Sequence, residues 1–98
     1  MEKGTEHYTL RHVKALLQAG KMEMTFAAYS HAAMMGLRWT GVRDILSRLE
    51  PADFYKSMTT YEDHRIWQDV YRPVTPHGAL YVKLTVASEV LVVSFKPR

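Results

Sequence analysis

Apolar residues recur at helical spacing in three segments of the first half of the chain. The first segment, Thr9–Gly20, opens on a threonine that can cap a helix, as Thr5 also can, and closes on a glycine suited to a left-handed stop. The third segment, Gly41–Leu49, has Thr40 as its expected cap, and Pro51 disfavours its continuation. Each of these segments is predicted to form a helix.

The second helical segment, Thr25–Gly36, is rich in alanine, which indicates close packing against a neighbouring element. Thr25 is its expected cap. The side chains predicted to face inward from this helix are Phe26, Tyr29, Ala33 and Met34.

The hydrophobic period changes to two in the second half of the chain. Ala79–Val86 alternates between apolar and polar residues, Val90–Lys96 is rich in β-branched residues, and Arg65–Arg72 favours a further strand. Pro73–Gly78 has the composition of a turn. We therefore predict one α+β domain over residues 1–98, with three N-terminal helices packed on a mainly antiparallel C-terminal sheet.

The last two strands are predicted to form a hairpin, and two registers keep its apolar positions on one face. In the first, Val86 lies opposite Leu91, a four-residue loop joins the strands, and Tyr81 lies directly opposite Lys96. In the second, Val86 lies opposite Glu89, only Ala-Ser forms the loop, and Tyr81 lies diagonal to Lys96. Ala-Ser is a poor two-residue turn, so the first register is favoured. The side chains then expected to face the core are Leu91, Val93 and Phe95.

Composition and charge exclude some classes of function and favour others. The chain has 98 residues, 47% of them hydrophobic, which suffices for a core, and it has no cysteine. Disulfides, zinc-thiolate sites and thiol nucleophiles are thereby excluded, and no cofactor or metal is expected. No signal peptide or membrane-spanning run is recognised, so a cytoplasmic location is expected. Thirteen Lys and Arg against ten Asp and Glu give a net charge of +3, which favours a polyanion as partner.

The segment Asp53–Arg72 interleaves aromatic, basic, amide and hydroxyl side chains with few aliphatic ones. Stacking faces beside cations suit a phosphate-bearing polymer with exposed bases, which indicates single-stranded RNA. Two of its aromatic residues, Trp67 and Tyr71, are expected to pack in the core rather than to stack on bases. The side chains considered for RNA binding are His64, Arg65, Arg72, Lys83 and His7.

Three stretches of this sequence, DFYKSMTTY, IWQDVYRP and the terminal VSFK, closely resemble the MqsR family of mRNA-cleaving toxins. The resemblance covers the whole chain. It implies a fold like that of the RelE toxins, and a ribosome-independent, metal-independent endoribonuclease that cuts single-stranded mRNA at GCU-like sites. It also implies neutralisation by a cognate antitoxin with a zinc-binding part and a helix-turn-helix part. The residues tied to activity in the family fall here on Lys56, Gln68, Tyr81 and Lys96.

RNA carries its own nucleophile, the 2′-hydroxyl, so a cleaving protein has to align it, move protons and stabilise charge on the phosphate. Lys56 and Lys96 are expected to stabilise the phosphate. Tyr81 is expected to donate to a non-bridging oxygen or to exchange the proton, and Gln68 to orient the sugar or read a base edge. Tyrosine and lysine are weak bases at neutral pH unless a neighbouring cation lowers the pKa, and the pairing of Tyr81 with Lys96 offers such a neighbour. The alternative function is a non-catalytic module that binds RNA or a protein partner.

Overall fold

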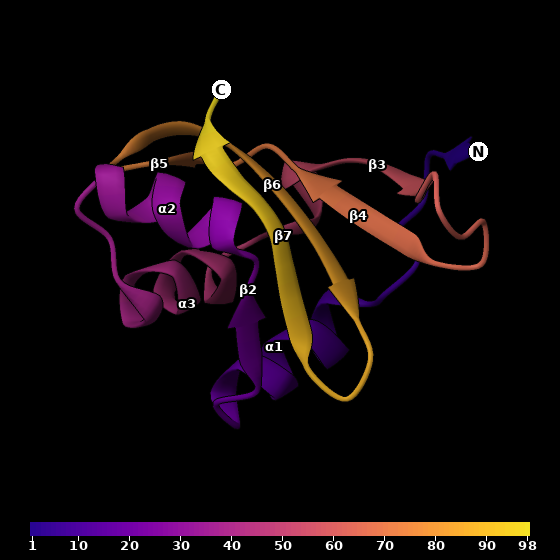
Figure 1. Cartoon of the computed structure of the whole chain (residues 1–98), viewed down its shortest axis with the longest axis horizontal. Helices are drawn as coiled ribbons and strands as arrows, with labels where there is room; N and C mark the ends of the chain where they lie inside the picture. The colour runs from indigo at the N-terminus through magenta and orange to yellow at the C-terminus, as the bar shows by residue number, and fades with distance from the viewer.

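Three helices and a seven-stranded sheet form the fold, and the computed structural model describes residues 1–98 (Figure 1). The helices are α1 (Leu10–Gln18), α2 (Phe26–Met34) and α3 (Trp39–Ser47), followed by the 3₁₀ helix η1 (Pro51–Asp53). The strands are β1 (Glu2–Lys3), β2 (Met22–Met24), β3 (Phe54–Thr59), β4 (Trp67–Tyr71), β5 (Val74–Thr75), β6 (Gly78–Val86) and β7 (Val90–Pro97). None of the helices has the length and apolar character needed to cross a membrane.

The first two helices begin and end as predicted. The hydroxyl groups of Thr9 and Thr25 each accept a hydrogen bond at 3.2 Å from the backbone amide three residues further on. Gly20 and Gly36 follow these helices with φ angles of 76° and 77°, a conformation that L side chains rarely adopt. Local chemistry therefore sets both helices.

The third helix begins earlier than predicted. It starts at Trp39 with Arg38 as its N-cap, instead of at Gly41 with Thr40 as its cap, and no side chain caps it. The Trp39 indole Nε1 donates a hydrogen bond of 2.9 Å to the carbonyl oxygen of Met22, which holds the first turn of the helix against β2. A tertiary contact, rather than a local cap, sets this helix start.

The predicted inward face of α2 is wrong. Phe26 and Met34 are more than 80% exposed and Tyr29 is 54% exposed, whereas Ala28 and Ala32 are buried. Thr25 binds the edge of β7, and α2 runs on along that strand, so the small side chains on its near face allow a close approach. The larger apolar side chains of α2, with the exposed Ala33, therefore point to solvent.

The predicted mainly antiparallel C-terminal sheet is also wrong. The strand order is β1-β3-β4-β6-β7-β2, with β5 paired to β6, and β2 runs parallel to β7. Two strands from the N-terminal half thus join the sheet, which is mixed, and the fold is α+β only in this broader sense. β1 and β2 have two and three residues, too few to show an alternating pattern in the sequence.

The hairpin of β6 and β7 has the expected pairing at its open end and a different one at its loop. Tyr81 lies directly opposite Lys96, as the favoured register predicts. Val86 pairs with Val90 and not with Leu91, so the loop has three residues, 87–89. The predicted four-residue loop is therefore wrong.

A β-bulge reconciles these two ends of the hairpin. Leu84 pairs with Val92 and Lys83 with Ser94, which leaves Val93 as an extra residue on β7. An extra residue in one strand of a pair moves the following side chains to the other face. The alternation along β7 therefore changes at Val93.

Because of the bulge, the residues of β7 that face the core differ from those predicted. Phe95 is fully buried as predicted, but Leu91 and Val93 are only partly buried. Val90 and Val92 are buried instead, because they precede the bulge.

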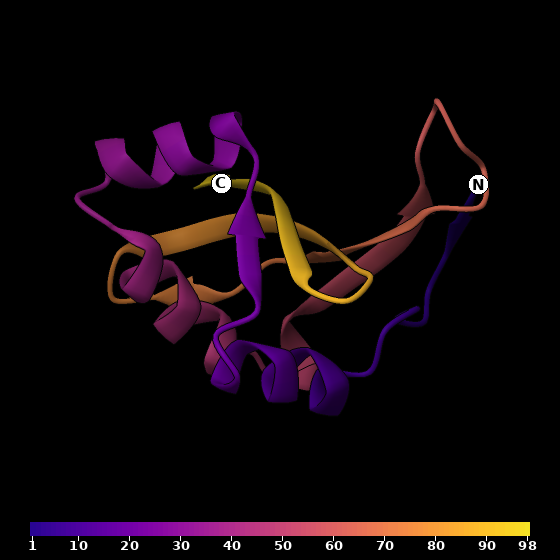
Figure 2. The ribbon, with the colours of Figure 1, turned by 60° about the horizontal axis from the view of Figure 1, so that its bottom comes forward.

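The core lies on one side of the sheet. α1 and α3 pack against that side and α2 runs along β7 (Figure 2). The core residues that the sheet contributes are Met22, Tyr71, Leu80, Val82, Leu84, Val90, Val92 and Phe95. We call the other side of the sheet, which carries the side chains alternating with these, the open face.

Candidate active site on the open face of the sheet

A row of four residues crosses the middle of the open face, one from each of four neighbouring strands. Lys56 of β3 pairs with Val70 of β4, Val70 pairs with Lys83 of β6, and Lys83 pairs with Ser94 of β7. Residues paired across strands project to the same face, so two lysine side chains lie on either side of Val70. Val70 is fully buried although it lies on the open face, away from the main core.

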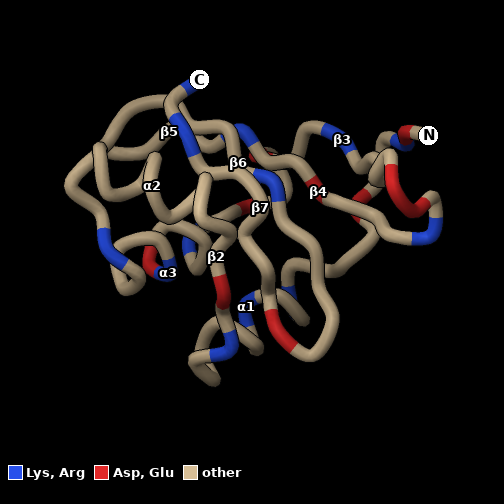
Figure 3. The backbone as a smooth tube through the Cα atoms, viewed as in Figure 1, with Lys and Arg blue, Asp and Glu red and all other residues tan.

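The other residues predicted to be catalytic lie on either side of this row. Tyr81 precedes Lys83 by two residues on β6, and its partner Lys96 has its Nζ 5.4 Å from the centre of the phenol ring. Gln68 precedes Val70 by two residues on β4 and is paired with Met58. The structure therefore brings Lys56, Gln68, Tyr81 and Lys96 to one face, although they come from four strands. Figure 3 shows Lys and Arg positions on β3, β6 and β7.

An acidic residue that the sequence did not indicate also reaches this face. Glu2 of β1 lies opposite Met58, and its Oε2 accepts a hydrogen bond of 2.8 Å from the Nζ of Lys56. This hydrogen bond and the charge of Lys56 lower the pKa of Glu2, and the bond to Glu2 raises the pKa of Lys56. Lys56 is thus a charged ammonium that already has a carboxylate partner.

A second β-bulge places an aromatic ring at the border of the site. On β3, Phe54 pairs with Tyr71 and Lys56 with Val70, so Tyr55 is the extra residue. The guanidinium carbon of Arg72 lies 4.7 Å from the centre of the Tyr55 ring, and the Nζ of Lys56 lies 5.4 Å from it. Tyr55 is 49% exposed. Arg72, predicted to bind RNA, therefore shares a cation–π contact with an accessible ring at the site.

Lys83 differs from the other lysines in its surroundings. Its side chain is partly buried, and this desolvation, followed by the charges of Lys96 and Lys56, lowers its pKa. The residue predicted only to bind RNA thus lies in the middle of the candidate site.

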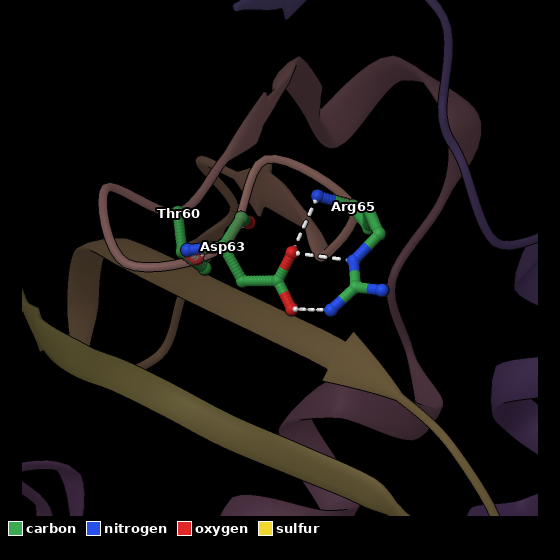
Figure 4. A network of polar contacts seen from close by, with 3 residues as sticks. All are labelled: Thr60, Asp63 and Arg65. Carbon is green, nitrogen blue, oxygen red and sulfur yellow. Dashed lines mark hydrogen bonds and ion pairs between the residues drawn. The ribbon is translucent and has the colours of Figure 1, made fainter.

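The loop between β3 and β4 carries two further residues predicted to bind RNA. His64 is exposed and lines a shallow pocket that Glu2 and Met58 also line, so the pocket adjoins the open face. Arg65 is paired with Asp63, whose two carboxylate oxygens accept from Nε at 3.0 Å and from a terminal nitrogen at 3.1 Å (Figure 4). The charge of Arg65 is therefore largely matched within the loop.

His7 lies on the other side of the sheet and does not join the site. Its ring stacks on Trp67, with centroids 5.4 Å apart, and its Nδ1 is 2.9 Å from the Nζ of Lys3. Trp67 alternates with Gln68 along β4 and so faces away from the open face. Tyr71 shares that side and is buried, which confirms its predicted packing role. No group of three or more His, Asp or Glu side chains is arranged to hold a metal ion.

Ammonium groups, a phenol and an amide on one sheet face form a surface suited to a phosphodiester, which is the class of site found in proteins that bind or cleave nucleic acids. Comparison with known proteins narrows this class. Residues 5–97 match the family model described as "Motility quorum-sensing regulator, toxin of MqsA". A curated protein of Escherichia coli (strain K12), named mRNA interferase toxin MqsR, is 49% identical over 98 residues, covering 100% of both chains. The chain belongs to the MqsR toxin family.

Proposed function

We propose that this chain cleaves single-stranded mRNA on the open face of its sheet, by attack of the substrate's own 2′-hydroxyl on the adjacent phosphate. The chain is an endoribonuclease, because it belongs to the MqsR toxin family and matches an mRNA interferase toxin over its whole length. The observation that carries the proposed site is the strand register, which sets Lys56, Gln68, Tyr81 and Lys96 on one accessible face.

The four residues have separate roles in this proposal. Lys56 and Lys96 approach the phosphate from two strands and stabilise the negative charge that develops on its non-bridging oxygens. Tyr81, held beside Lys96, donates its phenolic proton to the 5′-oxygen as that oxygen leaves. Gln68 orients the ribose on the side of the site nearest Met58. These roles require no metal ion.

A substrate phosphate would have to displace Glu2 from Lys56, since the two side chains form an ion pair. Both partners are accessible enough for exchange, with side-chain exposures of 28% for Lys56 and 56% for Glu2. The bases on either side of the cleaved bond can then stack on the Tyr55 ring at one end of the site and enter the pocket lined by His64 at the other end.

The test is cleavage of a short single-stranded RNA that contains one GCU site, in the presence of EDTA. The proposal predicts fragments that end in a 2′,3′-cyclic phosphate and a 5′-hydroxyl, faster cutting at GCU than at GAU, and no cutting when the nucleotide 5′ to the cleaved bond lacks its 2′-hydroxyl. Cleavage of that deoxy substrate would disprove 2′-hydroxyl attack.

Two substitutions test the assignment of the residues. Lys56→Ala and Tyr81→Phe should each lower the single-turnover rate by about 100-fold or more while the protein remains folded. Lys21→Ala is the matched control, because Lys21 is exposed and lies beside Val90, at the opposite end of β7 from Lys96. Equal losses in Lys56→Ala and Lys21→Ala would show that the effect is one of general charge.

We further propose that a cognate antitoxin, with a zinc-binding part and a helix-turn-helix part, neutralises this chain in the cytoplasm, where its mRNA substrate is found. The family description, a toxin of MqsA, supports an antitoxin partner. Adding the antitoxin to the cleavage assay should abolish cutting at one equivalent. Unchanged cutting with excess antitoxin would contradict the proposal.

A further inference from the structure

Lys83 occupies the centre of the residues that the proposed reaction uses. It shares its row with Lys56, lies two residues from Tyr81 on the same strand, and is diagonal to Lys96 across the hairpin. Two residues along a strand span about 6.6 Å, and diagonal neighbours on adjacent strands lie roughly 7–8 Å apart. A phosphate held by Lys56 and Lys96 therefore lies within reach of the Lys83 amine.

We propose that the neutral Nζ of Lys83 accepts the proton of the substrate 2′-hydroxyl, an inference that rests on the cleavage reaction proposed above. The 2′-oxygen then forms a bond to phosphorus while the bond from phosphorus to the 5′-oxygen breaks. Tyr81 gives its proton to that 5′-oxygen, and Lys83 afterwards returns a proton to Tyr81 through solvent. Atoms and charge balance without an oxidant, a metal or a further reactant.

The environment of Lys83 favours this role. Burial is the main cause that lowers its pKa, and the charges of Lys96 and Lys56 lower it further, so that more of the amine is neutral near physiological pH than in an exposed lysine. The titratable or charged groups on the elements around it are Glu2, Tyr55, Lys56, Arg72, Tyr81 and Lys96. Most of these are cations or neutral, and the one carboxylate among them is paired with Lys56.

Glu2 is the competing candidate for the proton acceptor, since it is the carboxylate at the site. Its hydrogen bond to Lys56 lowers its pKa below 4.5, which makes it a weaker base than an ordinary glutamate. It also lies three strands from β6, with β3 and β4 between the two. Lys83 is therefore closer to the proposed phosphate position than Glu2, and its neutral amine is a stronger base than the Glu2 carboxylate.

The experiment is a single-turnover pH–rate profile of the folded chain on the GCU-containing RNA, for wild type, Lys83→Met, Lys83→Arg and the control Lys21→Met. The wild-type rate should rise with pH and level off below the ordinary lysine value. Lys83→Met should lose about 100-fold or more at pH 8 and lose the rising limb. Lys83→Arg should keep RNA binding within a few-fold but not restore cleavage, because arginine stays protonated.

A substrate with sulfur in place of the 5′-oxygen separates the two proton transfers, because a thiolate leaves without protonation. With this substrate Tyr81→Phe should recover most of its rate, whereas Lys83→Met should not. Recovery of Lys83→Met would overturn the assignment, and so would a Lys83→Arg rate within about three-fold of wild type. If wild type itself fails to cut either RNA, the proposed cleavage function fails and not the role of Lys83 alone.

Thermal stability gives a readout that separates this role from a structural one. In the folded state the pKa of Lys83 lies below 10.5, so stability is gained as pH rises from the folded value toward 10.5. Lys83→Met removes this pH dependence. It also removes a partly buried positive charge that is repelled by Lys56 and Lys96. The melting temperature of the variant at pH 7 should therefore equal or exceed that of wild type. A variant that is stable, binds RNA and does not cut it supports the proposal, and a large drop in melting temperature contradicts it.

Discussion

Asp69 anchors the segment between β1 and α1 to the middle of the sheet. It is fully buried, and its carboxylate accepts hydrogen bonds from the backbone amide of His7, at 3.0 and 3.1 Å, and from that of Tyr8 at 2.9 Å. Asp69→Ala would leave both amides without a partner. Each lost bond to a charged acceptor costs about 1–3 kcal/mol, so the free energy of unfolding should fall by about 2–4 kcal/mol after partial rehydration of the segment.

Urea denaturation, with far-UV circular dichroism and tryptophan fluorescence as probes, measures this loss. For a domain of this size a fall of 2–4 kcal/mol corresponds to a melting temperature roughly 10–25 °C lower. Asp69→Asn keeps one acceptor oxygen and should lose about half as much. Asp44→Ala is the matched control, since Asp44 is exposed on α3 and should change stability by less than about 0.5 kcal/mol. A loss below about 1 kcal/mol for Asp69→Ala would refute the reasoning, because the two amides would then have found other partners.

Two further predictions concern ion pairs at the surface. Glu2→Gln removes the carboxylate that, in the proposed function, competes with RNA for Lys56. RNA should then bind roughly two- to five-fold more tightly in low salt, as measured by fluorescence anisotropy. Unchanged affinity would show that phosphate does not replace Glu2. Arg65 lowers the pKa of Asp63 below 3.8, so the stability contributed by this pair is present above that value and lost as pH falls through the folded pKa. Arg65→Met should weaken this pH dependence, because only the backbone amide at position 65 then still donates to Asp63, and the NMR titration of Asp63 should shift upward.

The sequence predicts those parts of the fold that local chemistry controls. Thr9, Thr25, Gly20 and Gly36 act within a few residues of their own positions, so the two helices that they bound could be recognised. The start of α3 depends on a hydrogen bond from Trp39 to a strand far from it in the sequence, and it was missed.

The orientation of α2 shows why hydrophobicity alone misplaces a face. Phe26 and Met34 are large and apolar and are expected inside, yet Ala28 and Ala32 are the buried residues of α2, the helix that packs along β7. The distance between a helix and the strand it packs on limits the size of the side chains that fit between them. This distance is set by the tertiary structure and not by the local sequence.

The candidate site was predictable in its residue types but not in its arrangement. Lys56, Gln68, Tyr81 and Lys96 could be named from the resemblance to a toxin family, and the pairing of Tyr81 with Lys96 also follows from the hairpin pattern. Nothing in the sequence indicates that Glu2 lies at the site. β1 is too short to be recognised, and its pairing with β3 joins residues more than 50 positions apart.

The two β-bulges explain why these side chains share a face at all. Without the extra residue Val93, continuing the pairing of Val86 with Val90 would set Tyr81 opposite Phe95, and Lys96 would turn toward the core. The bulge instead buries Phe95 and presents Lys96 beside Tyr81.

On the other side of the site, the extra residue Tyr55 lets Phe54 pack against Tyr71 in the core, with ring centroids 5.5 Å apart, while Lys56 stays on the open face. Each bulged residue directly precedes a member of the row that contains Lys83. A bulge changes the face only of the residues that follow it. The same two bulges can therefore keep apolar side chains in the core and place polar side chains on the open face. The residues of the proposed active site are therefore positioned by the same packing that holds the fold together.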